Sequence, residues 1–403
     1  MNSKRGSSAV FLMVILSALI SITLMLVYGI REECMRSRID GILNLAGNSV
    51  ISEYDLDIKE EYGLFMIAGQ EEILEDRFYR YAEYSLSHMD NADISKISVS
   101  GKRFSATDTE LIKGQILEYM KLEIAEDSHD IEKEDTDENI SENDMENREI
   151  RHGPTAVSLP SVAMPEKSLT VVAGEVAKNS EKIPEVFKSG IGTYMLDRYI
   201  LKKFNRRTMA VNKAHFFKNE VEYILGGERS DIKNEKRVET ALKAMRFPLN
   251  LAHIYLDPEK RAKTLAAAEM ITPGAAAAAT QALLASAWAY AESDNDVELL
   301  WQGHKIPVNK DKMTWAVDLD SVADGILKGP VMPAEEKGYG YDDYLRILMF
   351  FQDEEIKISR VLDLIQINTR VCRDGEFLIG EHVLGIDAEA VVNGRSYGYE
   401  KKY

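Results

Sequence analysis

The sequence is poor in cysteine and in positive charge. Cys34 and Cys372 are its only cysteines, so a small fold held together by disulfides is excluded, and the sequence leaves open whether the two pair. Against 67 Asp and Glu stand 49 Lys and Arg, which gives a net charge of −18. Because binding to nucleic-acid phosphates requires a basic face, this balance argues against a nucleic-acid partner.

Recognisable catalytic patterns are scarce as well. The seven histidines are scattered, none begins an H-E-x-x-H pair, and the interval from His215 to Glu220 is wrong for a zinc-binding helix. The chain has no phosphate-binding P-loop and no dinucleotide fingerprint. We therefore expect no catalytic, cofactor or metal site, and we do not expect an enzyme.

One long apolar run stands out against this background. The 22 residues from Ala9 to Ile30 carry no charge. As a helix they would rise about 33 Å, enough to cross a hydrocarbon core of about 30 Å. A cleaved secretory signal usually has an apolar region of about 7–15 residues. A retained transmembrane helix is therefore the favoured interpretation, and a cleaved signal is the alternative.

The charges on either side of this run predict its orientation. Lys4 and Arg5 precede it without an acidic residue, whereas residues 31–40 mix both signs. By the positive-inside bias, residues 1–8 form a cytoplasmic tail, residues 9–30 cross the cell membrane once, and the bulk of the chain is extracytoplasmic. That bulk is long enough for one large or two ordinary domains.

The helix is expected to continue beyond the membrane. Asp40 and Asn44 fall on one face of it, and apolar residues recur at helical spacing on another. Gly41 and Gly47 permit a kink, so an anchor followed by a separate surface helix is the alternative to one continuous helix. The apolar residues form a predicted helix packing stripe: Met35, Ile39, Ile42, Ala46, Val50 and Tyr54.

The remaining patterns predict an α+β fold in which helix dominates. Residues 31–122 form the first part of the extracytoplasmic region and residues 169–403 the second. The alanine-rich run 275–291 is expected to be a buried helix and not a second membrane span. Short strands are expected at residues 94–105 and near the C-terminus. Helices are expected at about 75–89, 107–124, 186–204, 234–255, 258–270, and, as one long amphipathic helix, 344–371.

An acidic segment separates the two parts. Residues 123–149 contain thirteen acids against Lys133 and Arg148, with no aromatic residue. Such a composition cannot bury enough apolar surface to offset the entropy of ordering, so residues 123–168 are predicted to be a disordered linker or insert. Although the segment is rich in oxygen ligands, it lacks the glycine turn and the ligand spacing of an EF-hand loop.

Several stretches carry a resemblance to a known family. They are KRGSSAVFLMVILSAL with SEYDLDIKEEYGLF, NEVEYILGGERSDIKNEKRVETALKAMRFPLNLAHIY, WAYAESDNDVELLWQGHKIPVNKDKMTW and YDDYLRILMFFQDEEIKISRVLDLIQINTR. In these stretches the chain resembles an uncharacterised family of membrane-anchored proteins from Gram-positive bacteria, related to the pseudopilins of the Tad (tight adherence, Flp-type) pilus. The resemblance implies a minor pilin-like component of a Tad-type pilus or secretion machine.

The same resemblance concerns the N-terminus. A pilin-like leader would end at Gly6, so that cleavage by a prepilin peptidase would leave Ser7 as the first residue. Phe11 would then be fifth, where a major pilin has a glutamate that neutralises the N-terminal amine of a neighbouring subunit. This departure suits either a cleaved tip or initiating pseudopilin, or an accessory anchor that is never cleaved, and the sequence leaves both open.

Together these observations predict a minor or accessory pilin-like component that acts by packing and assembly. Its expected partners are the lipid bilayer and other pilin-like or pilus-assembly membrane proteins. The alternative is a membrane-tethered extracellular binding or adhesion protein unrelated to a pilus.

Overall fold

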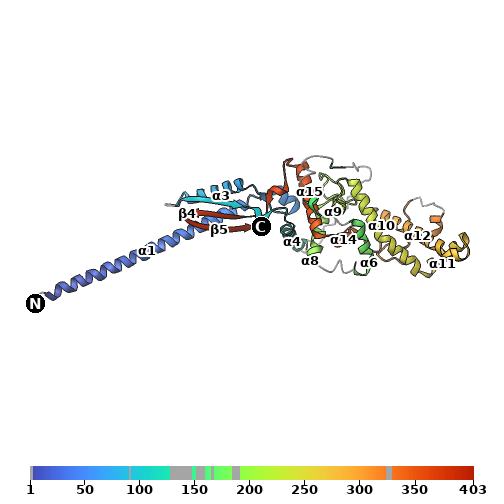
Figure 1. The fold of residues 1–403 in the computed structure, drawn as a ribbon, viewed down its shortest axis with the longest axis horizontal. Helices are drawn as coiled ribbons and strands as arrows, with labels where there is room; N and C mark the ends of the chain where they lie inside the picture. The colour runs from blue at the N-terminus through green and yellow to red at the C-terminus, as the bar shows by residue number, and fades with distance from the viewer. Residues whose placement is uncertain are drawn as a thin grey trace. The chain divides into compact units, whose positions relative to one another are not determined.

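The fold is given by a computed structural model that describes residues 3–89, 92–127, 148–150, 159–164, 168–183, 191–323 and 329–403. Helices dominate these ranges and strands are few, which confirms the predicted helix-dominant α+β class (Figure 1). Most of the predicted acidic linker, residues 123–168, lies outside the described residues. The chain divides into two compact units: unit 1 comprises residues 1–56, 65–106 and 381–403, and unit 2 comprises residues 57–64 and 107–380.

Unit 1 combines a long N-terminal helix with an antiparallel sheet. The sheet has the strand order β2-β4-β5, and β1 pairs with β3 in a separate two-stranded sheet. The elements of unit 1 are α1 (Ser3–Ile51), β1 (Ile67–Ala68), α3 (Glu71–Leu86), β2 (Ile94–Ser100), η1 (Lys102–Phe104), β3 (His382–Val383), β4 (Gly385–Val392) and β5 (Arg395–Lys402).

The core of unit 1 lies between the two helices and the sheet. Strand β4 alternates as a half-buried strand should, with Ile386, Ala388 and Ala390 buried. These side chains belong to one apolar cluster with Leu43 of α1 and Phe78 of α3. The second half of α1 is therefore part of this core.

A tight turn joins β4 to β5. Asn393 and Gly394 both have positive φ, of 52° and 76°. This is the Asn-Gly dipeptide that two-residue antiparallel hairpins favour, because their backbone twist requires positive φ at both central positions. The turn fixes the register in which Val392 lies opposite Arg395.

Unit 2 is a helical assembly. Helix α15 forms its middle, and every residue from Ile356 to Thr369 is buried. Helix α10 lies against α6, α9, α11 and α12. The elements are α2 (Leu56–Tyr62, from Asp57 onward), α4 (Thr109–Asp127), η3 (Pro160–Ala163), α6 (Leu169–Lys178), η4 (Ser180–Lys182), α8 (Ile191–Lys203), α9 (Glu220–Gly226), α10 (Asp231–Leu256), α11 (Pro258–Ile271), η5 (Gly274–Ala276), α12 (Ala277–Trp301), α13 (Leu319–Ala323), α14 (Tyr341–Phe351), α15 (Glu354–Cys372) and, up to Gly380, η6 (Ile379–Glu381).

Two findings differ from the sequence analysis. The single helix expected at 344–371 is wrong: Gln352 is extended and Asp353 begins a new helix, because its carboxylate accepts hydrogen bonds from the backbone N–H groups of Glu355 and Ile356. The chain also divides differently, because residues 381–403 belong to unit 1 and not to one unit with residues 169–380. The reason is that β4 pairs with β2, about 300 residues earlier.

Candidate functional site

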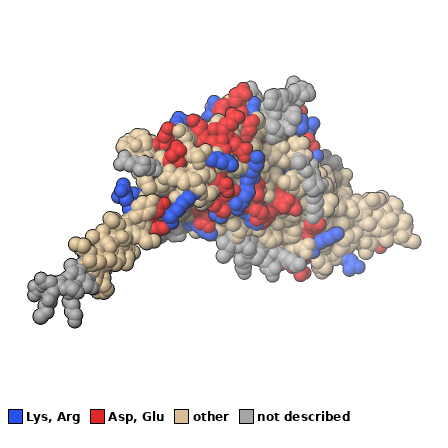
Figure 2. All heavy atoms as spheres, turned by 60° about the vertical axis from the view of Figure 1, so that its left-hand side comes forward, with Lys and Arg blue, Asp and Glu red and all other residues tan. Residues whose placement is uncertain are grey.

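The first half of α1 is an exposed apolar rod. It is the one helix among the described residues that is long and apolar enough to cross a membrane, with a mean hydropathy of 2.8 in its most apolar window and none of that window buried. Figure 2 shows this rod without a charged side chain along its described length. An uncovered surface of this size is unfavourable in water, so α1 is a candidate membrane-spanning helix.

The few hydroxyl groups in the rod fit the same environment. Ser17 donates to the carbonyl oxygen of Val14 at 2.9 Å, and Ser21 donates to that of Ser17 at 2.8 Å. Thr23 also donates to a backbone carbonyl one turn earlier. Because lipid offers no hydrogen-bond partner, side chains that are satisfied within their own helix can face it at little cost.

The helix packing stripe lies in the core of unit 1. Ile39, Ala46 and Val50 are buried, while Met35, Ile42 and Tyr54 are partly buried against the same cluster. The predicted stripe does not include Leu43, which is fully buried and lies between Ile42 and Ala46 on the same side of the helix. Leu43 follows Ile39 by four residues, and this helical spacing would have placed it on the buried face.

Gly47 lets the helix approach β5 closely. A Cβ added there would lie 3.2 Å from Cγ of Lys401, tighter than ordinary van der Waals contact. The predicted polar face also meets β5, since the hydroxyl of Tyr399 donates to Oδ1 of Asp40 at 2.7 Å. Helix α1 is continuous through both glycines, so the alternative of two separate helices is not what forms.

Gly6, Ser7 and Ala9, the predicted start of the membrane helix, lie in the first turns of α1, and Ile30, its predicted end, lies near the middle of α1. The side chains before Val10 are not among those that the structure describes. Whether the chain is processed after Gly6 stays a prediction.

Unit 2 contains a buried ion cluster that no sequence pattern indicated. Nδ1 of His215 lies 2.8 Å from Oε2 of Glu220, and Nε2 lies 2.6 Å from Oε1 of Glu61. Burial lowers the pKa of His215, but hydrogen bonds to these two carboxylates outweigh it and raise the pKa to about 9. With a carboxylate on each ring nitrogen, the imidazolium form of His215 is favoured at neutral pH, and it ties two segments of unit 2 together.

The two cysteines lie in different units. Cys34 and Cys372 are both free and exposed. Burial raises the pKa of the Cys372 thiol, which disfavours the reactive thiolate. Among the described residues there is also no group of three His, Cys, Asp or Glu residues that could hold a metal ion.

A serine pattern near the C-terminus has no catalytic geometry. Residues 394–398 spell G-x-S-x-G, the pattern of the nucleophile elbow of α/β-hydrolases. In that elbow the serine stands at a turn from a strand into a helix. Here Ser396 lies in β5, directly after a strand-to-strand turn. The pattern is therefore part of a hairpin and not a nucleophile elbow.

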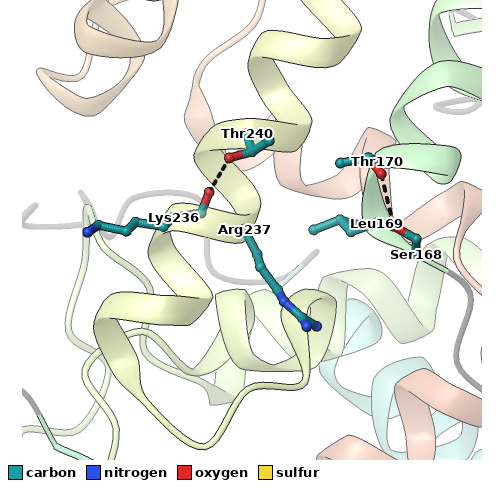
Figure 3. A pocket seen from close by; sticks show the side chains of 6 residues that line it. All are labelled: Ser168, Leu169, Thr170, Lys236, Arg237 and Thr240. Atoms are coloured by element: carbon teal, nitrogen blue, oxygen red, sulfur yellow. Dashed lines mark hydrogen bonds between the residues drawn. The ribbon is translucent and has the colours of Figure 1, made fainter.

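A pocket of about 420 Å³ lies between the start of α6 and α10. Figure 3 shows two hydrogen bonds among the residues that line it: the hydroxyls of Ser168 and Thr170 lie 2.9 Å apart, and the hydroxyl of Thr240 donates to the backbone carbonyl of Lys236. Among the described residues that line it there is no acid, histidine or cysteine.

These observations define a helix-dominant α+β protein with one N-terminal helix that is apolar enough to span a membrane. Residues 132–394 match the family described as "Family of unknown function (DUF5702)", and the chain belongs to that family. The matched residues begin after α1 and include most of unit 2 together with β3 and β4 of unit 1. No curated protein and no solved structure matches the chain.

Proposed function

We propose that this protein is a single-pass membrane protein that serves as a minor or accessory pilin-like subunit of a Tad-type pilus or secretion apparatus. It acts by packing and assembly, and not by catalysis. The observation that carries the proposal is α1, one unbroken helix whose first half is bare and apolar and whose second half is built into an antiparallel sheet domain. Such a helix transmits the position of a membrane-embedded segment directly to a folded head.

The two halves of α1 have separate roles in this proposal. The apolar half would bind the bilayer and the membrane helices of other pilin-like or pilus-assembly proteins, where association depends on close packing. The second half would hold unit 1 in fixed register, because its buried stripe cannot slide or rotate without exposing Leu43 and its neighbours. The N-terminus would remain cytoplasmic and the bulk extracytoplasmic, as Lys4 and Arg5 predict.

A charge placed in each half of α1 tests the proposal. In the pilus-bearing host, deletion of the gene is expected to reduce surface fibres, and the wild-type chain is expected to restore them. Ile20→Lys places a charge mid-membrane at a cost of about 2.5–3.5 kcal/mol, so it should fail to restore fibres. The matched control Leu45→Lys changes an exposed leucine of the packed half and should succeed. Normal fibres in the deletion strain would contradict the proposal and favour a tethered binding or adhesion protein.

Labelling of intact cells tests the orientation. With Cys34 and Cys372 replaced by serine, Met270→Cys offers a thiol at a side chain that is 86% exposed. A membrane-impermeant maleimide should label it on intact cells. The control Asn2→Cys should react only after lysis, or be missing if the leader is removed. Labelling of Met270→Cys only after lysis would contradict export.

A further inference from the structure

A fully buried cluster of four charged side chains lies between α10, α12 and the loop that follows α12. Arg246, Glu292 and Asp296 are 0% exposed, and the side chain of Lys310 is 1% exposed. Two cations and two carboxylates leave the cluster without net charge. Burying four ions is costly unless each is closely paired, so these contacts define what the cluster can do.

Asp296 is held as a carboxylate by α10. Its Oδ2 accepts hydrogen bonds from Nε of Arg246 at 2.9 Å and from the Asn250 amide at 3.0 Å. Its Oδ1 lies 2.5 Å from Nζ of Lys310. Burial alone would raise the pKa of Asp296, but Arg246 and Lys310 outweigh it and lower the pKa below its ordinary value.

Glu292 has a different environment. It contacts Nζ of Lys310 through Oε1. Oε1 also accepts a hydrogen bond from the backbone N–H of Ala316 at 3.0 Å, and Oε2 accepts one from that of Val317 at 2.7 Å. Burial raises the pKa of Glu292, which favours its protonated form. A buried amine thus touches an acid whose two oxygens both face backbone donors, with a second carboxylate beside it.

We propose that Lys310 and Glu292 condense into an intramolecular amide bond, and that Asp296 carries the proton that this step must move. Nζ of Lys310 contacts Oε1 of Glu292, and the carbon that it would attack is bonded to that oxygen. Reacting groups held in this way reach effective concentrations of about 10⁵–10⁸ M. Because Glu292 and Asp296 are fully buried, bulk water cannot reach the new amide bond and hydrolyse it.

The step balances without an outside reagent. The Lys310 ammonium gives a proton to the Glu292 carboxylate, which leaves a neutral amine and a carboxylic acid. The nitrogen attacks the carboxyl carbon, forming the N–C bond and a tetrahedral oxyanion that the amides of Ala316 and Val317 stabilise. Asp296 takes a proton from the attacking nitrogen and passes it to the hydroxyl group. The C–O bond breaks, one water molecule leaves, and a neutral amide remains.

Charge balance selects Glu292 over Asp296 as the acid that is consumed. After the reaction, Asp296 and Arg246 remain as a matched pair within hydrogen-bond distance. Reaction at Asp296 instead would leave the buried Arg246 without its partner carboxylate, a costly state in a dry interior. The product also replaces two buried ions by an amide, which relieves part of the cost of keeping them from water.

Tryptic digestion of the purified full-length protein tests the proposal. Trypsin does not cleave after an acylated lysine, and residues 264–305 contain no internal lysine or arginine. The expected product is peptide 264–305 joined to peptide 306–312, lighter than their sum by one water molecule, with fragmentation placing the bond between Glu292 and Lys310.

Two controls accompany the digest. Lys357 is also fully buried against one carboxylate, Oδ1 of Asp197 at 2.7 Å, and the chain should be cleaved after it in the same sample. Lys310→Arg keeps the positive charge and should yield separate peptides. Recovery of peptide 306–310 with a free Lys310 from the folded wild-type protein would overturn the proposal, and a bond to Asp296 would overturn the assignment of Glu292.

Discussion

Truncation of Leu43 tests whether the second half of α1 is part of the core of unit 1. Leu43 is 0% exposed and belongs to the cluster formed with α3 and β4. A buried Leu→Ala change loses transfer free energy and leaves a cavity, at a cost of about 2.7–5.0 kcal/mol. The neighbours of Leu43 come from a helix and a sheet that cannot easily collapse inward, so we expect about 3 kcal/mol for Leu43→Ala.

Hydrogen exchange of β4 is the direct assay. Strand β4 is the central strand of its sheet and is hydrogen-bonded on both sides, so its amides exchange through opening of the core. A loss of about 3 kcal/mol should speed their exchange about 100-fold in the full-length protein in detergent, since each 1.4 kcal/mol is about tenfold.

The matched control is two residues away on the same helix. Leu45 is 61% exposed, so Leu45→Ala should leave exchange in β4 within about twofold of the wild type, as surface changes cost under about 0.5 kcal/mol. Equal exchange in Leu43→Ala and wild-type β4 would refute the claim that α1 is built into this core.

Two further predictions concern unit 2. Folding raises the pKa of His215 from 6.5 to about 9, so its stabilising effect is fully present below pH 6.5 and is lost as the pH rises through about 9. Urea denaturation should show the free energy of unfolding falling across this window. The variant His215→Gln should reduce this dependence of stability on pH. Asp257 caps α11 by accepting from the backbone N–H groups of Glu259 and Lys260, so Asp257→Ala should cost about 1 kcal/mol in thermal unfolding. Glu259→Ala removes an exposed ion pair with Lys312 and an acid from the first turn of α11, and it should cost less than the loss of the cap. Equal effects of the two changes would contradict the capping role.

Local features were predictable from the sequence because they depend on neighbouring residues. The helical spacing from Met35 to Val50 predicts which face of α1 is buried. The capped start at Asp108 follows from the same kind of rule, since its carboxylate accepts from the backbone N–H groups of Glu110 and Leu111. The break at Asp353 had a similar signal, an Asp before two glutamates, which the continuous apolar pattern obscured.

Features that depend on distant residues were not predictable. His215 meets Glu61 across 154 positions, and nothing near either residue indicates the other. The pairing of β2 with β4 joins opposite ends of the chain and decides that residues 381–403 belong with α1. The amine of Lys310 reaches Glu292 only because the loop after α12 turns back onto that helix. A single sequence carries no record of such contacts.

Photo-crosslinking from the first half of α1 is the most direct test of the central claim, that this helix packs against partner helices in a membrane assembly. A photoreactive residue is placed in living cells at Leu19, Ile20, Ile22 and Leu24, which together sample the sides of the exposed rod. Our account predicts that at least one side gives a covalent adduct with another pilin-like or pilus-assembly membrane protein, identified by mass spectrometry, while the opposite side gives lipid adducts. Lipid adducts from all four positions, with no protein adduct, would contradict it.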